Sequence, residues 1–153
     1  MNYFYEKSLP VKMIRPFHVF GPGIDLSDGR VFSDFIANIL HSQDIVIKSD
    51  GSATRSFCYL ADALDMTLKV LLKGKNGAAY NIGNPDNEIS IKDLAYLLAP
   101  LAQSSIQVSV LGAPNTSAPL RSCPDISLGI QDVGFHPEYA IKDAFERTIN
   151  SLI

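Results

Sequence analysis

The sequence has no tryptophan and only two cysteines and three histidines among its 153 residues. Cys58 and Cys123 are too few for a disulfide framework, and their spacing is not that of a zinc site. The histidines, at positions 18, 41 and 136, are also too far apart to show metal-ligand spacing, so we expect no metal site. With so few cysteines, a reducing cytoplasm is the expected location.

The sequence also lacks an excess of either charge and any long hydrophobic run. Its 13 lysines and arginines against 16 acidic residues give a net charge of −3 without a basic cluster, so no nucleic-acid partner is expected. No apolar run approaches the roughly 18 residues of a membrane span, and no secretory signal opens the sequence. With 46% hydrophobic and 19% charged residues, the composition is typical of a single globular domain.

Glycine-rich phosphate-binding patterns are missing as well. Gly21 and Gly23 are followed by Leu26 at the place where a dinucleotide loop would carry its third glycine. Neither a P-loop nor a G-x-S-x-G motif is present. By itself, this stretch of chain is therefore not expected to cradle a dinucleotide diphosphate, because that contact needs glycines that let backbone amides approach the ligand.

Short strands and helices alternate along the sequence. Apolar runs predict strands, and apolar residues spaced three and four apart predict helices. The expected strands or extended segments cover residues 10–15, 45–47, 56–59, 78–82 and 106–111. The expected helices cover residues 31–41, 60–72, 90–101 and 141–152. This alternation predicts an α/β domain.

Three local patterns refine this prediction. Leucines at positions 60, 64, 68, 71 and 72 are expected to form the apolar stripe of the helix at 60–72. Ser90 followed by Asp93 resembles a capping box that opens the next helix. The segment 112–125 holds three prolines and is expected to be a loop.

Two patterns suggest chemistry. His18 is surrounded by proline, glycine and aromatic residues in a predicted loop after a strand, which is where α/β sheets bind ligands. Tyr3 and Lys7 form a Y-x-x-x-K pattern that would bring a phenol and an ammonium to one face of a helix. Such a pair can act as a general base, because the cation lowers the pKa of the tyrosine.

Five segments, in order, resemble motifs of extended short-chain dehydrogenases that act on nucleotide sugars. They are residues 15–23 (RPFHVFGPG), 28–32 (DGRVF), 50–62 (DGSATRSFCYLAD), 80–85 (YNIGNP), and 124–127 (PDIS) with 134–137 (GFHP). The chain is similar to NAD-dependent nucleotide-sugar epimerases and dehydratases, with UDP-glucuronate decarboxylases and dTDP-glucose 4,6-dehydratases as the nearest branch. The resemblance covers nearly the whole sequence.

The resemblance implies a fold and a place within it. Residues 1–153 would form a single substrate-binding portion, the C-terminal part of a Rossmann-type fold with a small lobe. In the family, the glycine-rich NAD loop and the catalytic Y-x-x-x-K pair come earlier in a chain about twice as long, so we expect the N-terminal NAD-binding half to be absent here. Lys7 lies too close to Arg15 to be in register with that pair, so no catalytic residue is assigned.

The resemblance also implies roles for single residues. Arg55 would bind the diphosphate, as a guanidinium suits two phosphate oxygens, and its alternative role is a surface salt bridge. Arg30 and Val19 would lie next to the cofactor, although Arg30 also fits a solvated first-turn position. Tyr3 falls where the decarboxylases have a substrate-contacting tyrosine.

Two positions depart from the family pattern. His18 stands where the family has an asparagine that contacts substrate or cofactor, which puts the sugar preference in question. The arginines that usually precede the P-D-I-S motif are replaced by Ser122 and Cys123, with Arg121 one residue further away. Arg121 is retained as a candidate substrate-binding residue.

These observations predict the nucleotide-sugar-binding portion of an NAD-dependent epimerase, dehydratase or decarboxylase in cell-surface polysaccharide precursor synthesis. The expected partners are a nucleotide sugar and, for the complete enzyme, NAD and a second copy in a homodimer. Two alternatives stay open: a non-catalytic nucleotide-sugar-binding remnant, and a subunit completed by a separate N-terminal chain.

Overall fold

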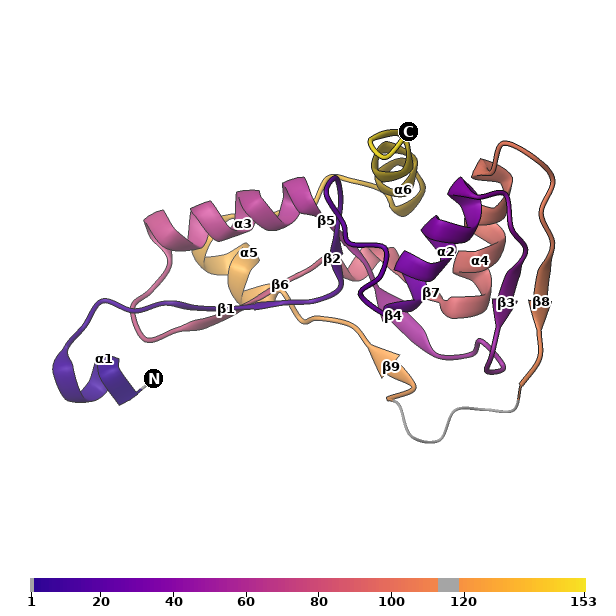
Figure 1. The fold of residues 1–153 in the computed structure, drawn as a ribbon. Helices are drawn as coiled ribbons and strands as arrows, with labels where there is room; N and C mark the ends of the chain where they lie inside the picture. Colours follow the sequence, from indigo (N-terminus) through magenta and orange to yellow (C-terminus); the bar gives the residue numbers. More distant parts are fainter. Residues whose placement is uncertain (1, 113–118) are drawn as a thin grey trace.

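The computed structural model describes residues 2–112 and 119–153, which form an elongated arm joined to a rounder lobe (Figure 1). The arm holds strands β1 (Met13–Pro16) and β6 (Ala79–Ile82) and helices α3 (Leu60–Lys73) and α5 (Ser127–Val133). A short helix, α1 (Asn2–Lys7), lies at the far end of the arm. Strands β2 (Val19–Phe20) and β5 (Cys58–Tyr59) pair in parallel where the arm meets the lobe.

The arm is a parallel pair of strands covered by two helices. β1 and β6 run in register from Met13 opposite Ala79 to Pro16 opposite Ile82. Helix α5 packs on both α3 and β6. The buried side chains of the arm form a small core of their own: Cys58, Ala63, Met66, Val70, Tyr80, Ile82, Ile126, Val133 and Phe135.

The lobe surrounds a larger core of aromatic and branched side chains. Its helices are α2 (Val31–Leu40), α4 (Ile91–Leu98) and α6 (Ile141–Asn150), with single-turn helices at Pro85–Asn87 and Ala99–Leu101. Strand β3 (Ile45–Ile47) pairs in parallel with β8 (Val108–Val110). Strand β4 (Thr54–Ser56) lies between β7 (Glu88–Ser90) and β9 (Arg121–Ser122). The rings of Phe20 and Phe145 stack at 4.1 Å in the centre of this core.

Most of the predicted elements are present. The helices expected at 31–41, 60–72, 90–101 and 141–152 correspond to α2, α3, α4 and α6. The capping of α4 is also confirmed, because the Ser90 hydroxyl accepts a hydrogen bond from the Asp93 amide at 2.9 Å. Helix α5 and strands β2, β7 and β9 were not predicted, since each is too short to show a periodic pattern. Strand β9 interrupts the loop expected at 112–125, of which residues 113–118 lie outside the described part of the chain.

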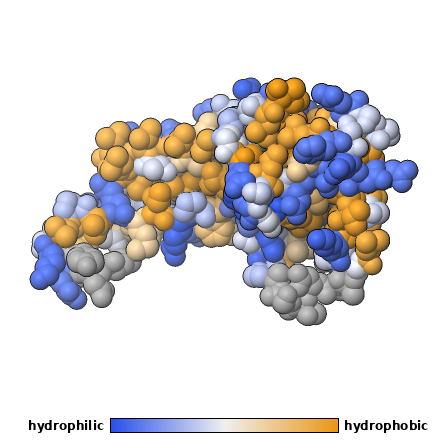
Figure 2. All heavy atoms as spheres, viewed as in Figure 1, coloured by the Kyte–Doolittle hydropathy of each residue, from blue (hydrophilic) through white to orange (hydrophobic). Residues whose placement is uncertain are grey.

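The leucine stripe expected on α3 is present, but it faces outward and does not pack on the core. The side of the helix that packs inward carries Ala63, Met66 and Val70, which share the same three-and-four spacing as the leucines. The leucines at 64, 68, 71 and 72 are instead 53–77% exposed. Figure 2 shows this apolar strip along the upper side of the arm. A helix with two apolar stripes leaves the choice of inner face to packing, which here selects the stripe of Ala63, Met66 and Val70.

Strand β1 is also uncovered. All four of its residues are exposed, although three of them are apolar or proline, and β6 is its one strand partner among residues 2–112 and 119–153. Parallel sheets are normally wider and covered on both faces. An open strand edge beside an apolar helix face promotes association with another chain.

We therefore expect this chain to self-associate when it is expressed as residues 1–153. Replacing Leu68 and Leu72 together by glutamine should reduce the associated fraction measured by size-exclusion chromatography with light scattering, because apolar area is removed from the strip. Leu111→Gln, at an equally exposed leucine on the lobe (73%), is the matched control and should change little. A monodisperse wild-type monomer would contradict this expectation.

A buried carboxylate connects the arm to the segment before α6. The side chain of Asp62, in the first turn of α3, accepts hydrogen bonds from the amides of Glu138 at 3.0 Å and Tyr139 at 3.3 Å. Asn84 and Asn87 donate to the Tyr139 carbonyl from the other side. Burial raises the pKa of Asp62 despite the two amides that favour its charged form. The carboxylate is therefore retained at a cost in solvation, and its two hydrogen bonds hold the start of α6 in place.

Asp62→Ala should destabilise the fold by about 2–4 kcal/mol, because two amides lose their acceptor in a buried position. The free energy of unfolding in urea, followed by circular dichroism, measures the loss. Asp65→Ala is the matched control on the same helix, since its carboxylate pairs with Lys69 at the surface and should contribute less than about 1 kcal/mol. Equal losses in the two variants would contradict the role of Asp62.

Candidate functional site

The three-stranded sheet β7–β4–β9 sorts its side chains onto two faces. Arg55, at the centre of β4, lies opposite Ser122 of β9 and Ile89 of β7. Directly paired residues project to the same face of a sheet, and their sequence neighbours project to the other. Arg55 and Ser122 therefore share the first face, and Arg121 lies on the second.

The first face collects a cluster of His18, Arg30, Arg55 and Ser122, here called the front cluster. The His18 Nε2 lies 3.3 Å from the Ser122 hydroxyl. His18 follows the end of β1 and has a left-handed backbone with φ of 39°. Burial lowers the pKa of its imidazole, and the positive charges of Arg55 and Arg30 lower it further. His18 is therefore neutral at pH 7, with one ring nitrogen that donates and one that accepts.

Of the two arginines in the front cluster, Arg55 donates fewer hydrogen bonds to other residues. Its guanidinium donates one hydrogen bond, at 2.7 Å, to the carbonyl of Thr54. Within the part of the chain that the structure describes, no carboxylate forms an ion pair with it. The side chain is partly buried, and its remaining N–H groups are free to bind a pair of anionic oxygens.

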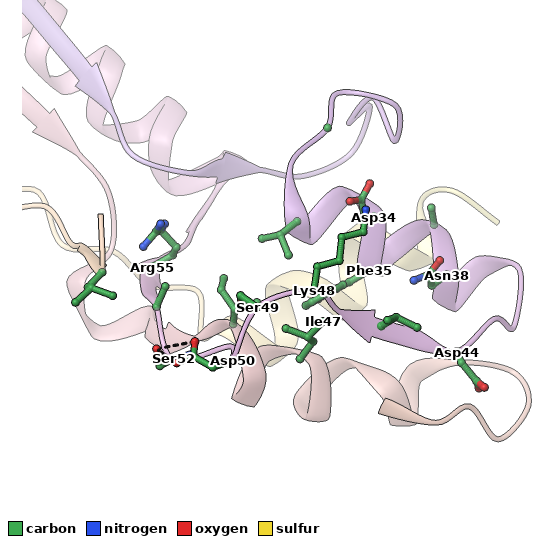
Figure 3. Close-up of a pocket in the computed structure, with 17 residues that line it drawn as sticks. Asp34, Phe35, Asn38, Asp44, Ile47, Lys48, Ser49, Asp50, Ser52 and Arg55 are labelled. Carbon is green, nitrogen blue, oxygen red and sulfur yellow. Dashed lines mark hydrogen bonds between the residues drawn. The ribbon is translucent and has the colours of Figure 1, made fainter. Parts of the chain in front are cut away.

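A groove of about 1040 Å³ begins at Arg55 and runs between α2, β3 and the turn before β4. Figure 3 shows Arg55 at one end and Asp44 at the other. Apolar side chains such as Phe35 and Ile47 share the lining with Asn38, Lys48 and the carboxylates of Asp34, Asp44 and Asp50. The size and mixed lining suit a small organic ligand with polar substituents. Residues 49–52 close one side through an Asp50–Ser52 hydrogen bond of 2.9 Å.

The second face holds a separate ion pair. Arg121 donates to both oxygens of the Glu88 carboxylate, at 2.8 and 2.7 Å, and the Thr54 hydroxyl donates to the same carboxylate at 2.7 Å. The sequence had grouped Arg121 with Arg55 as candidate substrate-binding residues. The structure instead places the two arginines on opposite faces of the sheet. Ser122, which was noted only as a departure from the family pattern, takes the place of Arg121 opposite Arg55. Strand alternation could have identified Ser122, had β9 been predicted.

Of the two residues expected next to the cofactor, Arg30 belongs to the front cluster and Val19 contacts it. Arg30 donates to the Asp28 carboxylate at 2.6 Å and to the Val19 carbonyl at 3.5 Å, and its guanidinium lies 4.9 Å from the ring centroid of Phe32. Arg30 is exposed at the start of α2, as the solvated alternative expects, and these contacts orient its guanidinium.

Tyr3 and Lys7 lie elsewhere. Tyr3 belongs to α1, at the far end of the arm from the lobe, and its side chain lies outside the part that the structure describes. Lys7 is the exposed last residue of the same six-residue helix. Among the described residues, no three histidine, cysteine or acidic side chains are grouped to hold a metal ion, and no helix is long and apolar enough to span a membrane.

The chain is similar to known proteins along almost its whole length. UDP-glucuronic acid decarboxylase 3 of Arabidopsis thaliana is 32% identical over 143 residues, which cover 93% of this chain and 41% of that protein. The UDP-glucuronic acid 4-epimerase of Bacillus cereus, solved with UDP-glucuronic acid and NAD, is 25% identical with a TM-score of 0.84 over 98% of this chain and 47% of that one. The UDP-glucose 4-epimerase of Thermotoga maritima, solved with UDP-glucose, is 20% identical with a TM-score of 0.88, and the match covers 98% of this chain and 48% of that one.

The fold is thus the α/β fold of Rossmann-type epimerases and dehydratases, as the sequence predicted. Residues 1–83 match the family model described as the NAD dependent epimerase/dehydratase family, and the chain belongs to that family. The resemblance noted in the sequence is confirmed. The chain spans less than half the length of the relatives it matches.

The ion pair on the second face gives a pH prediction. Arg121 and Thr54 hold the pKa of Glu88 at about 2, below its ordinary value of 4.5. A carboxylate with a depressed pKa stabilises the fold fully above the unfolded value and loses this contribution as the pH falls from 4.5 towards 2. Glu88→Gln should therefore lose less stability than wild type between pH 6 and pH 3, measured as the urea midpoint. Glu146→Gln, at a surface pair on α6, should follow the wild-type profile, and parallel profiles for all three proteins would exclude the role of Glu88.

Proposed function

We propose that this chain forms the nucleotide-sugar-binding part of an NAD-dependent epimerase, dehydratase or decarboxylase. The observation that carries the proposal is the guanidinium of Arg55, which forms no ion pair within the described part of the chain and lies at the mouth of the groove beside His18. A diphosphate is common to all nucleotide sugars, and a partly buried arginine suits its paired oxygens.

The groove and the front cluster would each bind a different part of the ligand. The groove along α2 and β3 is wide enough for a nucleoside, and Arg55 at its mouth would bind the diphosphate. The sugar would then extend towards His18 and Ser122, beyond the end of β1. This direction agrees with the general position of ligands at the carboxyl ends of parallel strands.

The described residues fit only the margin of a bound NAD. They include no glycine-rich loop to cradle its diphosphate, so Val19 and Arg30, beside the end of β1, are the residues that we propose to border the cofactor. NAD bound there would supply a reversible hydride acceptor for the sugar. The part of this chain is to hold the nucleotide and orient the sugar towards that end of the sheet.

The open edge of β1 and the leucine strip of α3 support a partner for the arm. We propose that an NAD-binding half covers β1 and that the complete enzyme is a homodimer acting in polysaccharide precursor synthesis. A separate chain that supplies this half is the second candidate, and the same open edge favours it. A non-catalytic nucleotide-sugar-binding protein would need the groove and Arg55 alone.

Arg55→Ala should weaken UDP binding roughly ten- to a hundredfold, because a charge-assisted hydrogen-bond pair to phosphate is worth about 1.5–3 kcal/mol. Arg55→Lys should recover only part, since an ammonium cannot make the bidentate contact. Isothermal titration calorimetry with UDP measures both. The matched control is Arg147→Ala, which removes the same charge from a surface pair on α6.

The control separates a direct phosphate contact from a general charge effect. Equal UDP affinity in wild type, Arg55→Ala and Arg147→Ala would show that Arg55 does not bind phosphate and would overturn the proposal. Equal weakening in both variants would point to net charge alone.

A further inference from the structure

The sugar end of the proposed site presents two neutral groups. His18 and Ser122 face each other at 3.3 Å, and both are partly buried. The imidazole and the hydroxyl can each donate and accept one or more hydrogen bonds. They match a sugar hydroxyl, which also donates and accepts.

The nearby cations have other partners, which are proposed for Arg55 and observed for Arg30 and Arg121. Arg55 is assigned to the diphosphate, and Arg30 is bound to Asp28 and to the Val19 carbonyl. Arg121, the cation closest in sequence to Ser122, lies on the other face of the sheet and is held by both oxygens of Glu88. Arg121 lies on the other face because the register of β9 places Ser122, and not Arg121, opposite Arg55.

A carboxylate at this position would lie within reach of the positive charges of Arg55 and Arg30, but it would have no guanidinium of its own to pair with. Burying an ionised carboxylate without a charged or multiple N–H partner carries a large solvation cost, whereas a hydroxyl is satisfied by neutral groups. We propose that the site selects a nucleoside diphosphate with an uncharged sugar over one with a uronic acid, and that Ser122 is the residue that decides between them. The proposal rests on the proposed function, and it differs from the substrate in the names of the decarboxylases and of the Bacillus cereus epimerase.

A comparison of the affinities for three ligands tests this inference on the chain of residues 1–153. Isothermal titration calorimetry with UDP, UDP-glucose and UDP-glucuronic acid should give a dissociation constant for UDP-glucose at least about tenfold below that for UDP-glucuronic acid. Ser122→Arg should reverse the order, because the new guanidinium faces the sugar and can pair with its carboxylate. Ser104→Arg adds the same charge at an exposed loop position and should keep the wild-type order.

Ser122→Ala gives a second measurement that adds no charge or bulk. It should weaken UDP-glucose several-fold and leave UDP unchanged, since only a sugar contact is lost. Tighter binding of UDP-glucuronic acid than of UDP-glucose by the wild type, with normal UDP affinity, would overturn the sugar preference alone. Absence of UDP binding would overturn the proposed function, and this inference with it.

Discussion

The pairing of β4 with its two neighbours determines which charges reach the site. Because side chains alternate along a strand, the pairing of Arg55 with Ser122 turns one arginine into the front cluster and the other arginine away from it. A shift of β9 by one residue would exchange Ser122 for a cation and release Glu88. The bidentate contact between Glu88 and Arg121 opposes such a shift, since it joins the strands on either side of β4. The ion pair on one face of the sheet thus keeps Ser122, and not a cation, on the other face.

The same alternation explains how far the sequence could predict the site. Arg55 was identified from one of five motifs that occur in this chain in the same order as in the family. His18 was identified from its position after a predicted strand. Ser122 required knowledge that β9 exists, and a strand of two residues after a proline-rich segment leaves no periodic signal. Arg121 was selected because arginine is expected near this motif, but its orientation depends on pairing between residues more than sixty positions apart in the sequence.

Helix α3 shows a similar limit for the fold. Its position and length follow from spacing, but two apolar stripes fit the same helix, and the leucine stripe was the more hydrophobic one. The inward face is set by the small arm core around Met66 and Tyr80, and by Asp62, whose hydrogen bonds to residues 138 and 139 fix the rotation of the helix. These contacts join distant parts of the chain, so a local pattern does not contain them. The exposed leucines in turn leave an apolar strip on the surface of the arm.

The backbone at His18 restricts how the proposed sugar preference could change over time. With a φ of 39°, this position favours glycine, asparagine, aspartate or histidine, and it penalises branched side chains whatever their chemistry. The residues tolerated at this position therefore form a short list, in which only glycine lacks a hydrogen-bonding side chain. Ser122 lies in an ordinary extended strand, where the backbone places no such restriction on the side chain. Divergence towards a new sugar would be expected to proceed first through Ser122, while residue 18 stays polar across many descendants of the same scaffold.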